Sequence, residues 1–302
     1  TETAADTIRE KVDALLFSGG IDTSLLAALL YERTEVPLVT VVLREGDAPD
    51  LDYSTLCARL LAGRQHIRYF DLDRAVRAAR ETIRVLQVFD PPEIRNGLTV
   101  WLGMDLCREL GLRTVMTGDG ADELFAGYGF LLDMPIDDIQ RWIGETHRNW
   151  RFSSPALGES MGLEVSQPFL SREVIEHGLT VPMDLKVRDG PEGRVGKYLL
   201  RRLVERRLGP ELAYRSKRAI EMGSGSTWLQ HGFADMLGQE DMEWIGEEIR
   251  PRTGEQAFYY KLFRELGLEV EKSRYPEEAC QVCGARVEKG FCRTCGSAQD
   301  QR

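Results

Sequence analysis

A short apolar run enters a glycine turn near the start of this chain, and a second apolar run follows the turn. Residues 14–17 (ALLF) precede the turn 18–24 (SGGIDTS), and residues 25–30 (LLAALL) follow it. This pattern predicts a buried strand, a tight loop and a helix. Glycines let backbone amides approach a ligand, and a helix N-terminus presents N–H groups with positive partial charge. The turn therefore predicts an anion site. Asp22 within the turn would repel a bare phosphate, so we expect a cation to bridge them, most simply Mg²⁺.

Strand-like and helix-like segments then alternate along the chain. We expect strands at 37–43, 66–70 and 113–117, and helices at 52–61, 73–88 and 94–110. This alternation predicts an α/β fold with a parallel twisted sheet and helices on both faces. Ligands of such sheets lie beyond the carboxyl ends of the strands, where the sequence places two glycine-rich loops, 18–24 and 117–128.

The strand pattern disappears after about residue 135, and helical patterns dominate from there. Segment 197–208 predicts a helix stopped by Gly209-Pro210, and 255–266 predicts the last long helix. We therefore expect three parts: an α/β core over 1–135, a mainly helical part over 136–271 and a small C-terminal element over 272–302.

The C-terminal element contains two C-x-x-C-G units. Its cysteines are Cys280, Cys283, Cys292 and Cys295. Four thiolates at this spacing predict a tetrahedral zinc ribbon, because a redox pair would not require the duplicate unit. The zinc would be structural, since four thiolates leave no open coordination position.

The second glycine-rich loop, 117–128, reads TGDGADELFAGY. It can place Asp119 and Asp122 against a cation from the side opposite Asp22. Acidic residues are also favoured at a helix N-cap, so the loop alone leaves both interpretations open.

Taken together, the two loops resemble a known family. The first has neither the Gly-Lys-Ser/Thr ending of a P-loop nor a G-x-G-x-x-G, and it resembles the SGGxDS signature of the ATP pyrophosphatase (PP-loop) superfamily. That superfamily cleaves ATP between the α and β phosphates and adenylates its substrate. With the second loop added, the chain closely resembles the synthetase domain of asparagine synthetases and the related β-lactam synthetases. Segments 167–171 (QPFLS), 197–201 (KYLLR), 214–217 (YRSK) and 223–228 (GSGSTW) match further family motifs in the same order.

The resemblance implies an adenine nucleotide alpha hydrolase-like fold and a role for each matching residue. Pyrophosphate would be held by Ser18, Gly19, Gly20, Thr23 and Ser24. Mg²⁺ would bind to Asp22 and Asp122. Adenosine would be framed by Leu16, Leu43, Thr117 and Gly118. Asp119 would orient the incoming nucleophile or take its proton. Lys197 and Lys217 would face the phosphates, and Lys217 is the better candidate for stabilising the charge that develops as pyrophosphate leaves.

Three features depart from the family pattern. The chain begins Thr1-Glu2 and soon reaches its first strand, so we expect no glutaminase domain and no glutamine hydrolysis in cis. Ser171 replaces the aspartate of the family's PFLD segment, which leaves the substrate pocket undefined. A zinc ribbon is not part of the usual asparagine synthetase.

The sequence therefore predicts an ATP-dependent, AMP-forming ligase. It would adenylate an acyl or amide-like oxygen of a small-molecule carboxylate or amide and pass the activated group to a nitrogen nucleophile. The nitrogen could come from ammonia, from a separate donor or from the substrate. One alternative is a PP-loop tRNA-modifying enzyme, whose zinc ribbon would bind RNA or a carrier protein. A second is a nucleotide-sensing scaffold without turnover.

Composition limits the partners and the location. The net charge of −10 argues against broad affinity for nucleic acid or anionic membranes, although basic residues gather in the segment 201–218. No apolar stretch is long enough to span a bilayer, and residues 1–11 are too polar for a secretory signal. We expect a cytoplasmic protein with no membrane partner.

Overall fold

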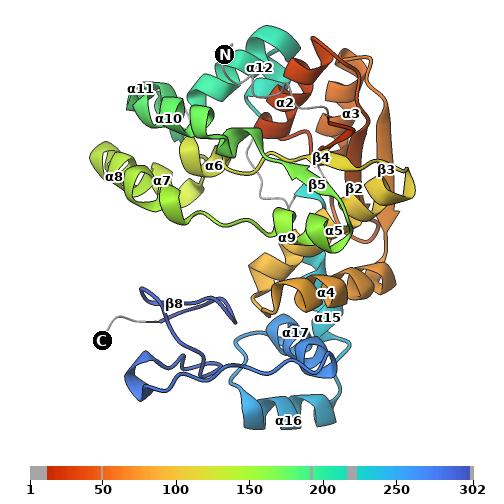
Figure 1. The fold of residues 1–302 in the computed structure, drawn as a ribbon, viewed down its shortest axis with the longest axis vertical. Helices are drawn as coiled ribbons and strands as arrows, with labels where there is room; N and C mark the ends of the chain where they lie inside the picture. Colours follow the sequence, from red (N-terminus) through yellow and green to blue (C-terminus); the bar gives the residue numbers. More distant parts are fainter. Residues whose placement is uncertain (1–11, 49, 191–192, 216–222, 300–302) are drawn as a thin grey trace.

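A five-stranded parallel sheet forms the centre of the molecule (Figure 1). The computed structural model describes residues 12–48, 50–190, 193–215 and 223–299. The sheet has the order β3-β2-β1-β4-β5, and all four neighbouring pairs are parallel. Its strands are β1 (Ala14–Leu16), β2 (Leu38–Leu43), β3 (Gln65–Phe70), β4 (Thr114–Met116) and β5 (Glu164–Ser166). The predicted α/β fold is confirmed.

The strand order creates a switch point beside β1. The chain adds β2 and β3 on one side of β1 and then returns to add β4 and β5 on the other side. The loops that follow β1 and β4 therefore leave neighbouring strands at the same edge of the sheet, where ligands of open α/β sheets bind. Residues 17–20 and 117–120 form these two loops.

Helices cover both faces of the sheet because side chains of successive strand residues point to opposite faces. Leu38 of β2 belongs to one hydrophobic core and its neighbour Val39 to another. The core that contains Leu38 is completed by α2 (Ile21–Tyr31), α3 (Asp50–Leu60), α12 (Tyr198–Leu208) and α13 (Pro210–Ala213).

The opposite face packs against α4 (Leu72–Leu86), α5 (Pro91–Glu109) and α9 (Ser153–Ser160). Three further helices join this layer: α15 (Leu229–Ala234), α16 (Gln239–Glu248) and α17 (Gly254–Glu265). A buried ion pair between Arg95 of α5 and Glu255 of α17 links the two parts of the layer. Glu255 also accepts a hydrogen bond of 3.0 Å from the Tyr259 hydroxyl.

The following elements complete the described residues. They are α6 (Ala121–Leu124), α7 (Gly129–Leu132), α8 (Ile136–Thr146), η1 (His147–Asn149), η2 (Pro168–Leu170), α10 (Arg172–Thr180), α11 (Met183–Lys186), β6 (Arg188–Gly190), β7 (Gly193–Val195), η3 (Ser226–Trp228), η4 (Pro276–Glu278), β8 (Phe291–Cys292) and β9 (Ser297–Ala298). Among the helices that the structure describes, none combines the length and apolarity needed to cross a membrane.

The sheet extends further along the chain than the sequence pattern indicates. We expected no strand after about residue 135, but β5 pairs with β4 through three partners, from Thr114–Glu164 to Met116–Ser166. A three-residue strand is too short to show a recognisable period of two. The two-stranded pair β6–β7 is equally short. The proposed division of the chain into three parts stays a prediction.

Candidate functional site

The first glycine loop rests on α3 and leads directly into α2. Gly19 has a φ of +70°, and a Cβ there would lie 2.5 Å from the backbone nitrogen of Ser54, so only glycine fits. Gly20 is the N-cap of α2, and no side chain caps the helix there. The Ser18 hydroxyl accepts a hydrogen bond of 3.2 Å from the Gly20 N–H. The first turn of α2 therefore keeps donors for an anion.

The hydroxyls of this loop do not share one environment. Thr23 donates a 3.3 Å hydrogen bond to the Gly20 carbonyl and lies 3.4 Å from the Ser18 hydroxyl, so both belong to the loop. Ser24 is 1% exposed, and its neighbours Leu25 and Leu26 belong to the same hydrophobic core as Cys57 of α3. Ser24 therefore lies on the core side of α2.

Lys197 brings the two predicted metal-binding aspartates together. Its Nζ lies 2.6 Å from Oδ2 of Asp22 and 2.9 Å from Oδ1 of Asp122. Burial alone would lower the pKa of Lys197, but the carboxylates of Asp122 and Asp22 outweigh burial and raise it, so the ammonium stays charged. One cation already contacts both carboxylates, and carboxylate oxygens also suit Mg²⁺.

The backbone fixes Lys197 at this point. Its φ of 55° is in the left-handed region, and its N–H donates a 2.9 Å hydrogen bond to the Phe125 carbonyl. A Cβ on Gly127 would overlap both the Asp122 carboxylate and the Lys197 side chain. The glycine of the FAGY segment is therefore needed for the ion pair to form.

Asp119 is held by three donors from different parts of the chain. Its Oδ2 accepts hydrogen bonds from the Thr117 hydroxyl at 2.7 Å, from the Gln167 amide at 2.8 Å and from the Ser154 hydroxyl. The Gln167 amide also donates to the Ser154 hydroxyl at 3.2 Å. These bonds fix the carboxylate that, by the family resemblance, would orient the incoming nucleophile or take its proton. The sequence analysis did not single out Ser154 and quoted Gln167 only as part of a motif.

Arg215 is a further residue that sequence reasoning missed. Its Nη1 donates a 2.8 Å hydrogen bond to the Gly19 carbonyl, and its Nη2 pairs with the buried Asp50. The guanidinium also lies 4.5 Å from the centroid of the Tyr53 ring. The segment that ends at Arg215 therefore supports the first glycine loop. The only sequence signal was the basic run 201–218, which does not distinguish Arg215 from its neighbours.

The four residues predicted to frame adenosine lie at neighbouring strand ends. Leu16 and Leu43 end β1 and β2, and Thr117 and Gly118 directly follow β4. A Cβ on Gly118 would lie 3.2 Å from Cβ of Asp22, so the two loops are in contact there. Lys217 lies outside the described residues.

Ser171 has a structural role that the sequence left open. It is the N-cap of α10, and its hydroxyl accepts a 3.3 Å hydrogen bond from the Val174 N–H. Serine and aspartate are both favoured N-caps, so Ser171 preserves the cap at the position where the family has aspartate.

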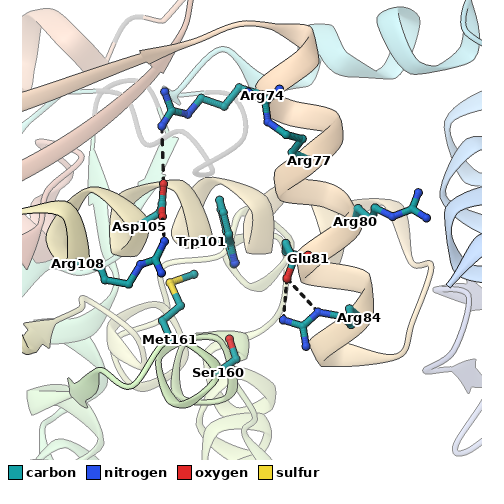
Figure 2. A pocket seen from close by; sticks show the side chains of 10 residues that line it. All are labelled: Arg74, Arg77, Arg80, Glu81, Arg84, Trp101, Asp105, Arg108, Ser160 and Met161. Atoms are coloured by element: carbon teal, nitrogen blue, oxygen red, sulfur yellow. Dashed lines mark hydrogen bonds and ion pairs between the residues drawn. The ribbon is translucent and has the colours of Figure 1, made fainter.

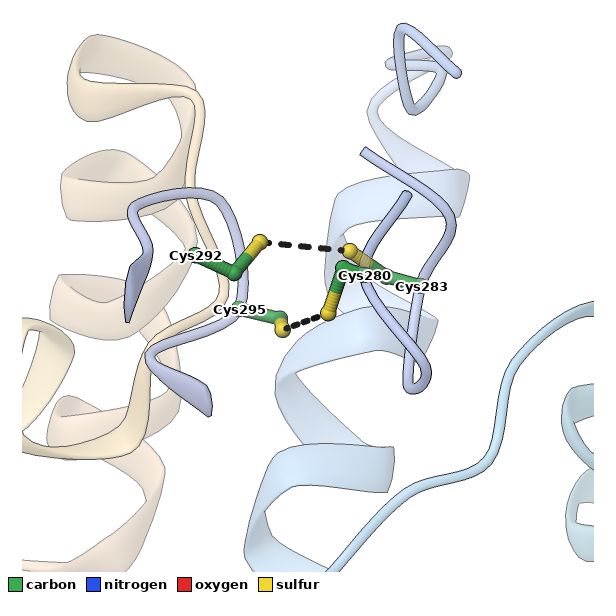
Figure 3. A group of neighbouring side chains, drawn as sticks. All are labelled: Cys280, Cys283, Cys292 and Cys295. Carbon is green, nitrogen blue, oxygen red and sulfur yellow. Dashed lines mark hydrogen bonds between the residues drawn. The ribbon is translucent and has the colours of Figure 1, made fainter. Parts of the chain in front are cut away.

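The four C-terminal cysteines form one buried cluster (Figure 3). Their sulfurs lie within 4.8 Å of one another, and the pairs Cys280–Cys295 and Cys283–Cys292 are both 3.6 Å apart. A disulfide would require about 2.05 Å. A tetrahedral zinc with Zn–S bonds of about 2.3 Å would place its sulfurs about 3.8 Å apart. The cluster therefore fits a four-coordinate zinc.

The cluster packs into the body of the molecule. Its cysteines share a hydrophobic core with Phe89, Tyr260 and Phe263. The Gln256 amide of α17 donates a 2.6 Å hydrogen bond to the Cys295 carbonyl, and the Phe89 N–H donates one of 2.8 Å to the Thr294 carbonyl. The cysteine cluster is therefore continuous with the layer formed by α4, α5 and α17.

The fold and the two loops define an adenine nucleotide alpha hydrolase domain. Residues 7–160 and 155–283 match the family model described as Asparagine synthase. The chain belongs to the asparagine synthase family, a family that uses ATP.

The sequence identity between this chain and the family members that it matches is low. It is 25% identical to glutamine-hydrolyzing asparagine synthetase 3 of Arabidopsis thaliana over 277 residues, which cover 83% of this chain and 48% of the relative. It is 26% identical to the enzymes of Lotus japonicus and Gallus gallus, with 90% and 82% of this chain and 51% and 48% of theirs covered. The chain thus spans about half the length of these relatives. A solved structure described as a predicted subunit of a tRNA methyltransferase from Methanocaldococcus jannaschii matches at 16% identity, over 67% of this chain and 91% of that one; its TM-score of 0.30 is too low to support an argument.

Proposed function

We propose that this protein is an ATP-dependent, AMP-forming ligase that makes a carbon–nitrogen bond. In the first step an oxygen of a carboxylate or amide substrate attacks the α-phosphorus of ATP, and the bond to the leaving pyrophosphate breaks. In the second step a nitrogen nucleophile attacks the activated carbon, AMP leaves and the nitrogen loses a proton. The observation that carries the proposal is the convergence of Asp22, Asp122 and Lys197 at the switch point of the sheet.

Each half of the site has its own task in the first step. The loop 18–20 and the start of α2 bind the pyrophosphate portion through backbone N–H groups and the hydroxyls of Ser18 and Thr23. Asp22 and Asp122 hold Mg²⁺, which offsets phosphate charge when bound. Lys197 keeps the two carboxylates in place and offers a buried positive charge beside the departing pyrophosphate.

Asp119 serves the second step. Its three hydrogen bonds hold the carboxylate in one orientation, which suits a group that must orient an amine or accept its proton. The donor of the nitrogen would be free ammonia, an amine of the substrate or the product of a separate glutaminase. The cysteine cluster would hold zinc as a structural ion.

Pyrophosphate release tests the proposal directly. Purified protein is incubated with ATP, Mg²⁺ and ammonium, with a panel of carboxylates and amides that includes aspartate. Release that depends on one of these substrates is expected, together with equimolar AMP. A parallel reaction with bulk tRNA tests the alternative of base modification, because that reaction would use the same first step. No stimulated release from any substrate in the panel would contradict a ligase.

Two substitutions test whether pyrophosphate release depends on the predicted metal site. Asp22→Ala removes one carboxylate of the metal pair and is expected to abolish release. Asp137→Ala changes an exposed aspartate in the first turn of α8 and is the matched control, with release expected at the wild-type rate. Activity that survives in Asp22→Ala would refute the Mg²⁺ assignment.

A further inference from the structure

An arginine-rich pocket lies between α4, α5 and α9, outside the two glycine loops (Figure 2). Its volume is about 470 Å³, within the range of small-molecule sites. Five arginines line it: Arg74, Arg77, Arg80, Arg84 and Arg108. Glu81 and Asp105 are its only acidic lining residues in the part of the chain that the structure describes. The lining is therefore positively charged although the whole chain carries −10.

Carboxylates neutralise four of these five arginines. Arg108 and Arg74 lie 2.8 Å and 3.7 Å from Asp105, and Arg84 lies 2.6 Å from Glu81. Two carboxylates outside the lining also contribute, because Glu109 lies 3.4 Å from Arg74 and Glu265 lies 2.7 Å from Arg80. Arg77 makes no hydrogen bond or ion pair with any described residue. An arginine without a carboxylate partner, placed among other arginines, favours an anion with several oxygens.

An aromatic ring lies beside these charges. Trp101 projects from α5 into the space between α4 and α9, close to Glu81 and Ser160 (Figure 2). Its indole N–H has no hydrogen-bond partner among residues 12–48, 50–190, 193–215 and 223–299. A flat ring next to guanidinium groups is the combination that binds a base and its phosphates.

A second pocket lacks this combination of clustered arginines and a tryptophan ring. It has a volume of about 720 Å³ and lies against α3 and β3. Its charged lining residues are Asp52, Arg59 and Glu211, so its net charge is negative. It contains tyrosines but no cluster of arginines.

We propose that the pocket between α4, α5 and α9 binds a nucleotide, with the base against Trp101 and the phosphates against Arg77. The nucleotide is either free or part of a single RNA strand, since both present the same base and phosphate. This inference goes beyond the proposed ligase activity and does not depend on it. Arg84 lies two turns further along α4, about 10 Å from Arg77 along the helix, and stays paired with Glu81.

Binding of two probes to the full chain tests the inference. The probes are a fluorescent uridine diphosphate and a fluorescent ten-residue oligouridylate, each titrated by anisotropy. Each titration is repeated with Asp22→Ala, which alters the glycine-loop site and leaves the pocket between α4, α5 and α9 unchanged. Binding of the diphosphate identifies a free nucleotide as the ligand, and binding of the oligouridylate alone identifies an RNA strand.

Three variants locate the binding. Arg77→Gln changes an exposed side chain and is expected to weaken binding about tenfold, the effect of one lost charge-assisted hydrogen bond. For the oligouridylate it should also lower the slope of log K against log salt by about 0.7. Trp101→Leu is expected to weaken binding about tenfold through lost stacking, with its melting temperature measured alongside. Arg59→Gln in the second pocket is the control and should leave binding unchanged.

Two results would overturn the proposal. One is that neither probe binds the wild-type protein at low salt. The other is that Arg77→Gln and Arg59→Gln bind a probe equally well, because the binding would then lie elsewhere. Arg77 is exposed, so the second result cannot be attributed to loss of the fold.

Discussion

Replacing Lys197 with methionine would remove the charge that joins the two glycine loops. The lysine side chain is 4% exposed, and the carboxylates of Asp22 and Asp122 are 17% and 24% exposed. Breaking a buried ion pair costs about 3–5 kcal/mol, and the partial access of water to the carboxylates favours the lower end, about 3 kcal/mol. At about 2–4 °C per kcal/mol, the melting temperature would fall by about 6–12 °C.

Magnesium should reverse part of this loss. In Lys197→Met the two carboxylates no longer contact an ammonium group. Mg²⁺ can therefore bind them without displacing a positively charged side chain. Mg²⁺ at 100 times its Kd would restore about 2.7 kcal/mol. The wild-type protein should gain less, because its lysine already contacts both carboxylates.

Chemical denaturation in urea, with and without MgCl₂, measures both effects. Lys261→Met is the matched control: Lys261 pairs with Asp241 at 2.8 Å, but the two side chains are 26% and 22% exposed. Its loss should cost less than about 1 kcal/mol and should not respond to Mg²⁺. The reasoning is refuted if Lys197→Met unfolds within about 1 kcal/mol of the wild type, or if Mg²⁺ stabilises both proteins equally.

Three further predictions concern other parts of the molecule. Gln167→Leu removes one donor from Asp119, and kcat should fall about tenfold while KM for ATP stays unchanged; an unchanged kcat would exclude a positioning role. Cys280→Ser should eliminate the one zinc per chain expected in native mass spectra of the wild type, and wild-type protein purified without zinc would contradict the metal assignment. Burial lowers the pKa of Lys186 to about 8 from 10.5, so the folded chain binds fewer protons than the unfolded chain between these values and stability rises with pH across them. Lys186→Met should remove that rise and add up to about 3 kcal/mol at pH 7, which urea titrations at pH 7 and pH 10 would check.

The sequence indicated the centre of the fold because its local signals agree. An apolar strand, a Gly-Gly turn and an apolar helix follow one another directly around Gly19 and Gly20. A strand, a Gly-Asp-Gly turn and a short acidic helix follow one another around Gly118 and Gly120. Two such units in an alternating chain leave few arrangements other than a parallel sheet. The four cysteines were equally informative, since their spacing alone brings four sulfurs together.

The sequence could not indicate partners that are distant along the chain. Asp119 depends on Ser154 and Gln167, and Gly19 depends on Arg215, yet serine, glutamine and arginine are common in unremarkable surface positions. The position of Lys197 is a similar case. Its motif predicted a phosphate contact, whereas its place between two aspartates depends on how the two loops approach each other. These contacts arise from tertiary packing, which local pattern does not encode.

The late position of β5 has a consequence for synthesis on the ribosome. Until Glu164–Ser166 emerges, β4 is an edge strand with open hydrogen-bonding groups, although every other strand of the sheet has already been made. The two residues that fix Asp119 from outside its loop also come late, at Ser154 and Gln167. A nascent chain of about 135 residues would therefore expose an unpaired strand next to an unfinished loop. Slow translation before residue 166 should make the chain more prone to aggregate, and rapid passage through this segment should protect it.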